Sequence, residues 1–322
     1  MECCYKEKVM YITIDLVKAI ACLLIVNFHC SFVYPESLAV LSFGGDLGNN
    51  IFFMISGFLL FPSIEKSSFH EFGSWVKKRY LRILPLSMMF NLLSYLFMPN
   101  REYVGNIFHC FIFPMVYWFI GALFLFYPLI FLVQKIKNEK MKAIIIVFLL
   151  VLHVIFDSVQ AERYFIGFIA MIVGCWLRKN AEKLEKRGHC LIASAVFFFI
   201  YAFLKIVYAK EIGQPQMIHL LIGIMILLTS IFLILGLFQR EKELKIMVEK
   251  NVWLNKIIHS VSNLTLSVYL CQQLINFTIV ELFLKLKFPF SVAAYLIATF
   301  AAAYLAYRVD IWFRKVLLKN KL

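Results

Sequence analysis

The sequence predicts an all-α protein, a polytopic transmembrane bundle of about ten helices that forms a single domain over residues 1–322. Composition is the first observation: 62% of the residues are hydrophobic and 16% are charged, with a mean hydropathy of +0.81. Soluble domains are only about half apolar. The second observation is that apolar windows near the ~20 residues needed to cross a bilayer recur along the whole chain. The third is an alternation of basic charge between the segments that connect these windows.

Ten apolar windows are candidates for membrane spans. They lie near residues 11–33, 49–63, 83–99, 114–134, 142–158, 163–177, 189–208, 217–238, 261–283 and 288–312. The second and third windows are short, and Gly57, Pro62 and Pro85 favour tilted or broken helices there. We expect the first span to stay in the mature protein, because Asp15 and Lys18 interrupt it and no small-residue cleavage pattern follows.

Basic residues alternate between the predicted loops, and this sets the expected topology. Residues 35–48 hold no Lys or Arg, so we expect this segment to face outward. The basic groups that should lie inside are Lys66, Lys77, Lys78, Arg79 and Arg82; Lys135, Lys137, Lys140 and Lys142; Arg178, Lys179, Lys183, Lys186 and Arg187; and Arg314, Lys315, Lys319 and Lys321. The polar stretch 239–260 is also basic. Because positive charge is retained on the cytoplasmic side, both termini are predicted to be cytoplasmic.

The same bias accounts for the net charge of +14. No basic segment is long enough for a nucleic-acid-binding module, so we expect no nucleic-acid partner. The eight cysteines are scattered without the spacing of metal ligands, so we expect free thiols and no metal site.

His29 is the first candidate for chemistry, since it lies in the outer third of the first span, about 27 Å along a helix that rises ~1.5 Å per residue. Ionisable groups within the membrane tend to face a bundle interior or a watery cavity. The alternative is a neutral imidazole bonded to a neighbouring helix. Lys18 lies on nearly the same face as His29, with Asp15 as its expected partner one turn away. His153 and His219 lack companion motifs and look structural.

Two further motifs precede residue 86. Residues 44–58, GGDLGNNIFFMISGF, bring small and polar side chains into the second span. For Ser56 and Gly57, contact with a ligand and packing against a helix are both open interpretations. The run KKRYLRILP places Arg79 and Arg82 one turn apart on a helix face at the inner boundary. Guanidinium groups bind phosphate in a bidentate way, whereas the alternative, anchoring to anionic lipid, needs only positive charge.

In their order along the chain, these motifs resemble those of the acyltransferase-3 family of membrane acyltransferases, which modify surface glycans and related acceptors. Lys18 and His29 resemble the first-helix Arg and His of that family, and residues 44–58 resemble its Gly-rich, Phe-Phe, Ser-Gly-Phe signature. Arg79 and Arg82 match its R-x-x-R before Ile-Leu-Pro. The runs 117–123 and 267–270 are similar to its later aromatic and Tyr-Leu motifs. The specific part of the resemblance covers about the first 85 residues.

Three positions depart from the family pattern. Lys18 stands where the family usually has Arg, which keeps the charge but loses the fork geometry. Asn50 stands where Asp is common, and Gln272 where a His often follows Tyr-Leu. Both amides hydrogen-bond but cannot titrate.

The resemblance implies an O-acyltransferase of the bacterial inner membrane, with acetyl-CoA as the acyl donor and no permanently bound cofactor. It implies His29 as the catalytic residue and Arg79, Arg82 and Lys18 as donor-binding residues. The acceptor would be a hydroxyl of a surface glycan or its lipid-linked precursor, with membrane lipid around the chain. Further candidates for orienting the imidazole or contacting substrate are Glu36, Asp46, Asn50, Ser56, Tyr269 and Gln272.

Two other functions use the same residues. A transporter or flippase for a glycan, lipid or metabolite would line its translocation path with these charged groups. A catalytically silent scaffold is the third possibility, which the departures at Lys18, Asn50 and Gln272 slightly favour.

Overall fold

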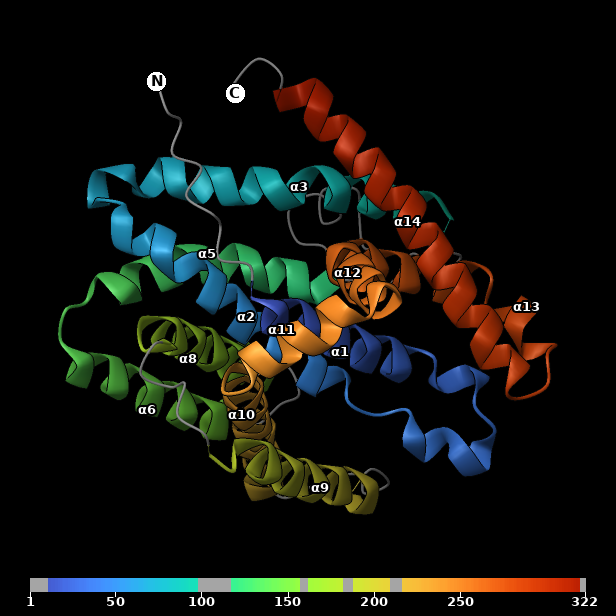
Figure 1. Cartoon of the computed structure of the whole chain (residues 1–322), viewed down its shortest axis with the longest axis horizontal. Coiled ribbons are helices and arrows are strands. Elements are labelled where there is room, and N and C mark those ends of the chain that lie inside the picture. Colours follow the sequence, from blue (N-terminus) through green and yellow to red (C-terminus); the bar gives the residue numbers. More distant parts are fainter. Residues whose placement is uncertain (1–10, 98–116, 157–161, 182–187, 209–215, 319–322) are drawn as a thin grey trace.

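A computed structural model describes residues 11–97, 117–156, 162–181, 188–208 and 216–318 (Figure 1). Within these ranges the chain forms twelve α-helices and no strand, which confirms the all-α class. The helices are α1 (Ile12–His29), α2 (Gly45–Lys66), α3 (Phe72–Phe97), α5 (Trp118–Lys135), α6 (Glu139–Phe156), α8 (Gly167–Lys179), α9 (Cys190–Tyr208), α10 (Gln216–Phe238), α11 (Glu241–Lys250), α12 (Val252–Thr278), α13 (Val280–Leu284) and α14 (Phe290–Leu318). Short turns occupy Ser31–Val33 (η1), Glu36–Leu41 (η2), Phe69–Glu71 (η3) and Glu162–Ile166 (η5, a π-helical turn).

Each predicted span falls on a helix, although parts of three windows, 98–99, 114–116 and 157–158, lie outside the described residues. Over the described ranges, seven helical stretches are long and apolar enough to cross a membrane. The other three expected spans fail for visible reasons. The first turn of α6 is charged, and α12 carries many polar side chains. The stretch formed by η5 and α8 carries Glu162 and Arg163 at one end and Arg178 and Lys179 at the other. The total of about ten spans therefore stays a prediction.

Two helices extend well beyond their apolar windows. The window at 83–99 lies in α3, which begins at Phe72, and the window at 261–283 lies mostly in α12, which begins at Val252. The polar stretch 239–260 is itself largely helical, because it holds α11 and the first turns of α12. Hydropathy marks the part of a helix in lipid, whereas Lys, Arg and Glu continue the same helix into the interface. Of the two expected irregularities, tilted or broken helices, breaks are absent, since α2 and α3 run through Pro62 and Pro85.

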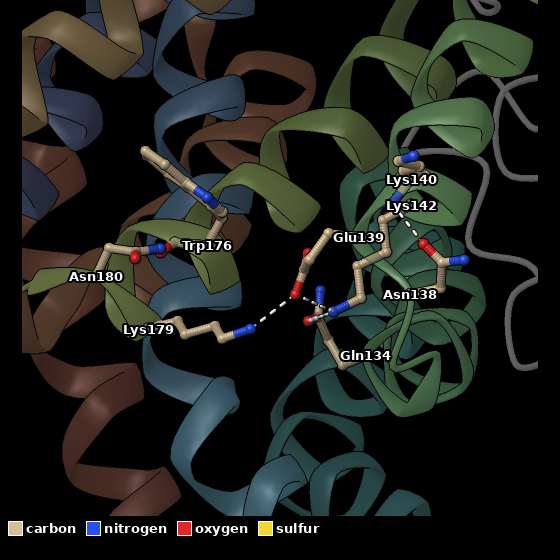
Figure 2. Close-up of polar contacts among 8 residues, drawn as sticks. All are labelled: Gln134, Asn138, Glu139, Lys140, Lys142, Trp176, Lys179 and Asn180. Carbon is tan, nitrogen blue, oxygen red and sulfur yellow. Dashed lines mark hydrogen bonds and ion pairs between the residues drawn. The ribbon is translucent and has the colours of Figure 1, made fainter.

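Two of the basic groups predicted to be cytoplasmic meet at one carboxylate. At the meeting point of α6 and α8, Lys179 Nζ lies 2.7 Å and Lys142 Nζ 3.3 Å from Glu139 Oε1 (Figure 2). The hydrogen bond from Lys179 is the main cause that lowers the pKa of the Glu139 carboxyl. This contact therefore holds at neutral pH and is lost as the pH falls through that lowered value. Nearby, Lys135 Nζ donates to the Ile64 carbonyl at the end of α2.

The core is built mainly from α1, α2, α5, α8 and α12, and α9 lies at the edge of the bundle opposite α3 (Figure 1). The closest packing is between α2 and α8. A Cβ at Gly57 would lie 2.0 Å from the Met171 carbonyl oxygen, and one at Gly174 would lie 1.9 Å from the Met54 carbonyl oxygen. These glycines let the two backbones touch, which is the helix-packing interpretation of Gly57.

Substitution of Gly57 should therefore destabilise the bundle. Gly57→Ala places a methyl group against a backbone oxygen that cannot rotate away, at an expected cost of about 1–3 kcal/mol or more. We expect a lower midpoint of thermal unfolding in detergent micelles. Gly121→Ala in α5 is the matched control, because no atom lies within 4 Å of its added Cβ. Equal midpoints for the two variants would show that the α2–α8 contact is looser than described.

Candidate active site

A cavity of about 490 Å³ opens among α1, α2, α3, α5, α12 and α14. Several candidate residues from distant parts of the sequence meet in its wall. Its polar and charged lining comprises Lys18, Asn49, Ser56, Arg79, Arg82, Tyr127, Ser262, Asn263, Thr265, Ser267, Tyr269, Tyr307, Asp310 and Arg314. Apolar side chains of α2, α3, α5, α12 and α14 complete the wall. The lining is therefore rich in cations and hydroxyl groups, a composition suited to a ligand that is anionic at one end.

Arg79 is held in a fixed orientation at the cavity wall. Its Nη2 donates to Ser63 Oγ at 2.7 Å, and its guanidinium lies over the Trp75 ring at 5.1 Å from the centroid. The Trp75 indole donates to the same hydroxyl at 3.1 Å. Arg79 Nε is buried and has no hydrogen-bond partner among the described residues. Arg82, one turn further along α3, has an exposed side chain that lines the cavity.

Lys18 lines the cavity from α1, and its expected partner is in place. Its Nζ lies 3.9 Å from Asp15 Oδ1. Asp15 also accepts from Ser262 Oγ at 2.5 Å and lies 2.8 Å from His259 Nδ1, both on α12. Asp15 therefore joins α1 to α12 beside the cavity, in addition to pairing with the lysine.

His29 is the last residue of α1 and is half-buried against α12. Its Nε2 lies 3.4 Å from Gln273 Nε2, and Asn276 Nδ2 donates to its backbone carbonyl at 3.1 Å. The imidazole thus faces a neighbouring helix. This is the contact expected of a structural histidine, and a side-chain amide is equally able to orient a catalytic imidazole.

His29 is not among the residues that line the cavity. Lys18 and His29 are eleven residues apart on α1, a rise of about 16 Å. Along α12 the separation is smaller, because Tyr269 lines the cavity and Gln273, four residues later, reaches His29. About one helical turn of α12, roughly 6 Å, thus separates the cavity wall from the residue that contacts the imidazole.

A family model described as an acyltransferase domain, Acyl_transf_3, matches residues 11–308. The chain belongs to the acyltransferase-3 family. The match extends from α1 into α14, far beyond the motifs that carry the resemblance, and with the seven apolar helical stretches it supports a multi-pass membrane acyltransferase. Comparison with curated proteins found no match, and comparison with solved structures found none either.

Two more candidate residues of this acyltransferase-3 protein, Ser56 and Tyr269, lie at the large cavity. The Tyr269 hydroxyl accepts from the backbone N–H of Phe119 at 3.3 Å. Ser56 is next to Gly57, and the two interpretations of this motif are divided between them: Ser56 faces the cavity, whereas Gly57 packs against α8.

Asp46 and Asn50 lie instead at a second cavity of about 20 Å³, beside Arg163 of η5. Asn50 Nδ2 donates to the Ile166 carbonyl at 3.4 Å, and Asp46 Oδ2 pairs with Lys205 Nζ at 3.0 Å. No hydrogen bond between Asp46 and His29 is found in the described part of the chain. Asn49 lines both cavities, so α2 presents successive amides to the two spaces.

The other two candidates lie away from both cavities. Glu36 is exposed in the turn η2, and Gln272 is fully buried, with neither side-chain polar atom bonded within the described residues. The neighbour of Gln272, Gln273, is the residue that reaches His29. Gln272, the residue that the Tyr-Leu motif indicates, thus lies one residue before the amide that contacts His29, which is about 100° further around the helix.

Several site residues were missed by the sequence motifs: Arg163, Gln273, Asn276, Asp310 and Arg314. The helical spacing of polar residues does indicate Gln273 and Asn276. Successive separations of seven, four and three residues place Ser262, Tyr269, Gln273 and Asn276 along one face of a helix. Arg314 was noted only as part of the basic tail, and nothing local in the sequence indicates that it enters a cavity.

Replacement of Gln273 should lower the rate of acyl transfer without stopping it. Gln273→Ala removes the one side-chain amide found near the His29 ring in the described structure, and a neutral hydrogen bond is worth about 0.5–1.5 kcal/mol. We expect up to a tenfold lower turnover at an unchanged level of protein in the membrane. Gln273→Asn, one methylene shorter, should recover less than half of the lost rate. An unchanged rate in Gln273→Ala would mean that this amide does not position the imidazole.

Proposed function

We propose that this acyltransferase-3 protein is an O-acyltransferase of the bacterial inner membrane that transfers acetyl from cytoplasmic acetyl-CoA to a hydroxyl of a surface glycan or its lipid-linked precursor. The observation that carries the proposal is the convergence of Lys18, Arg79 and Arg82 in one cavity of a chain of this family. His29 lies about one turn of α12 beyond the cavity wall.

Support for a CoA donor comes from the charge and size of the cavity. The phosphates of CoA are anionic, and two guanidinium groups with a lysine ammonium are suited to them. Arg79 is already oriented by Ser63 and Trp75, so little side-chain entropy is lost when it binds an anion. A volume of about 490 Å³ is within the ~300–1,000 Å³ common for small-molecule sites.

The proposed reaction requires a base near the acceptor hydroxyl. His29 takes the hydroxyl proton while the oxygen attacks the thioester carbonyl carbon, and the carbon–sulfur bond breaks. The imidazolium then returns its proton to the departing CoA thiolate, so that the products are an ester and free CoA. If His29 instead carries the acyl group first, the same bond to sulfur breaks and the hydroxyl attacks acyl-histidine in a second step.

The pantetheine arm would have to pass Tyr269 to bring the thioester toward Gln273 and the imidazole. The phenol and the amide lie on one face of α12, so the path would follow a single helix. The phosphates would stay at the arginines, and only the acyl end would move toward the acceptor side. This arrangement accounts for an anion site and a histidine at different depths of the same bundle.

A reconstituted assay tests the proposal. Purified protein in liposomes is supplied with radiolabelled acetyl-CoA on one side and a model saccharide acceptor on the other. We expect acetylated acceptor and free CoA in equal amounts, each on its own side. Counterflow of intact saccharide or acetyl-CoA without release of CoA would support a transporter instead, a function that the family match does not favour.

The natural acceptor requires a measurement in cells. Mass spectrometry of surface glycans from cells with and without the gene should show the loss of acetyl esters from one glycan class. A loss of another acyl group, such as succinyl, would keep the enzyme class and correct the donor. Identical glycans in the two strains would argue against a glycan acceptor.

A further inference from the structure

The last helix contributes an ion pair to the wall of the large cavity. Asp310 and Arg314 of α14 both line it, although the family match ends at residue 308. These two residues are therefore features of this chain that neither the motifs nor the family match assigns to the site.

Arg314 is anchored between two helices. Its Nε and Nη2 lie 2.8 Å and 2.7 Å from Asp310 Oδ2, a paired contact within one turn of α14. Nη2 also donates to the backbone carbonyl of Arg82 at 2.7 Å, where α14 crosses α3 (Figure 1). The guanidinium is thus fixed beside Arg82 while 30% of the side chain stays exposed.

The charges in the cavity are unbalanced. Four cationic side chains line it: Lys18, Arg79, Arg82 and Arg314. Asp310 in the wall pairs with Arg314, and Asp15 beside the cavity pairs with Lys18. Among the described residues, no carboxylate pairs with Arg79 or Arg82, which supply the surplus of positive charge. Like charges held together in a partly enclosed space repel one another unless an anion offsets them. The surplus of positive charge is therefore matched to a ligand with several negative charges.

The neighbours of the three arginines differ. Arg79 is half-buried and bonded to Ser63 of α2, whereas Arg82 is exposed, and the half-buried Arg314 is bonded to the Arg82 carbonyl. A CoA thioester that points its acyl end toward Tyr269 has its pyrophosphate further out. Its 3′-phosphate, at the opposite end of the molecule, is then nearest the cavity mouth. That group is a phosphate monoester, of a kind that carries about −1.5 to −2 charges at neutral pH.

We propose that Arg314, held in place by Asp310, binds the 3′-phosphate of the CoA donor and so makes the enzyme select CoA over its 3′-dephospho form. This inference rests on the proposed donor and adds to it a residue and a group on the ligand. Asp310 and the Arg82 carbonyl occupy Nε and Nη2, so Nη1 is the nitrogen that can donate a charge-assisted hydrogen bond to a phosphate.

The test compares binding of acetyl-CoA and acetyl-3′-dephospho-CoA to the full-length protein in zwitterionic lipid nanodiscs. We expect the wild type to prefer acetyl-CoA. Arg314→Gln should bind acetyl-CoA about tenfold or more weakly and leave the affinity for the dephospho form unchanged. Arg308→Gln is the matched control on the same helix, because Arg308 bonds to Tyr304 and does not line the cavity. It should change neither affinity.

A second variant covers the case in which Arg314→Gln fails to fold. Arg314→Lys keeps the charge but loses the fork, so it should show a smaller loss confined to acetyl-CoA. Equal weakening of both donors, or no weakening, would overturn the inference while leaving the proposed function intact. Failure of the wild type to bind either donor would instead reject the proposed function. The measurement is repeated in nanodiscs that contain anionic phosphatidylglycerol. If Arg314 binds this lipid and donor selection is unchanged, the guanidinium recognises a lipid phosphate and the inference is wrong.

Discussion

His29→Ala should abolish transfer of the acyl group to the acceptor. General acid–base catalysis by a positioned side chain contributes about 10²–10⁴-fold, so we expect a fall in turnover of at least about 100-fold. Donor binding should be unchanged, because His29 lies outside the cavity that holds the arginines. The measurement is formation of acetylated acceptor by purified protein in liposomes, with donor affinity determined on the same preparation.

His219→Ala is the matched control for this prediction. His219 is a half-buried histidine of α10 that does not line the large cavity. It should transfer acetyl at the wild-type rate and be present in the membrane at the wild-type level. Full activity in His29→Ala would remove the proposed catalyst, and equal losses in the two variants would point to damage to the fold.

Arg79→Ala should have the second largest effect, on the donor. Hydrogen bonds to charged groups contribute about 1.5–3 kcal/mol, so we expect the dissociation constant for acetyl-CoA to rise about 10–100-fold. Arg79→Lys should recover only part of this affinity, because the ammonium cannot reproduce the fork and does not stack on Trp75 in the same way. Isothermal titration in nanodiscs measures both.

Lys78→Ala distinguishes phosphate recognition from anchoring to lipid. Lys78 is the exposed residue next to Arg79 and does not line the cavity. Its loss removes the same charge from the interface and should leave donor affinity unchanged. If the lysine and arginine variants lower the affinity equally, the basic segment acts through general positive charge at the membrane surface.

The helical class and the places of the helices were predictable, because apolar windows of bilayer length form helices in lipid wherever they occur. The ends of the helices were not. Hydropathy shows 239–260 only as a polar stretch, yet α11 and the start of α12 lie there. Its charged side chains are good helix formers, and hydropathy does not register helix propensity outside the bilayer.

Part of the cavity lining was predictable, because motifs fix both the residue type and the helix face of Lys18, Arg79 and Arg82, and these residues meet in one cavity. The motif indicates Gln272 by its place after Tyr-Leu, but the orientation of α12 against α1 directs Gln273 toward His29. Arg314 enters the cavity only because α14 crosses α3, a tertiary contact that no local pattern indicates.

Sequence spacing also placed Lys18 and His29 on one face of one helix, but it could not show that the cavity ends before the imidazole. Whether a helix face borders an open space depends on the side chains of several other helices. Here Tyr269 of α12 forms part of the wall on the side of His29. The proposed mechanism requires the acyl end of the donor to move from that wall to the imidazole.

A cryo-EM structure of the protein in nanodiscs with a non-hydrolysable thioether analogue of acetyl-CoA tests this step most directly. We expect the phosphates to contact Arg79 and Arg82, and the acyl end to pass Tyr269 and lie within hydrogen-bonding reach of the His29 ring. An analogue bound with its acyl end directed away from α12, or bound on a surface without these arginines, would contradict the proposed site.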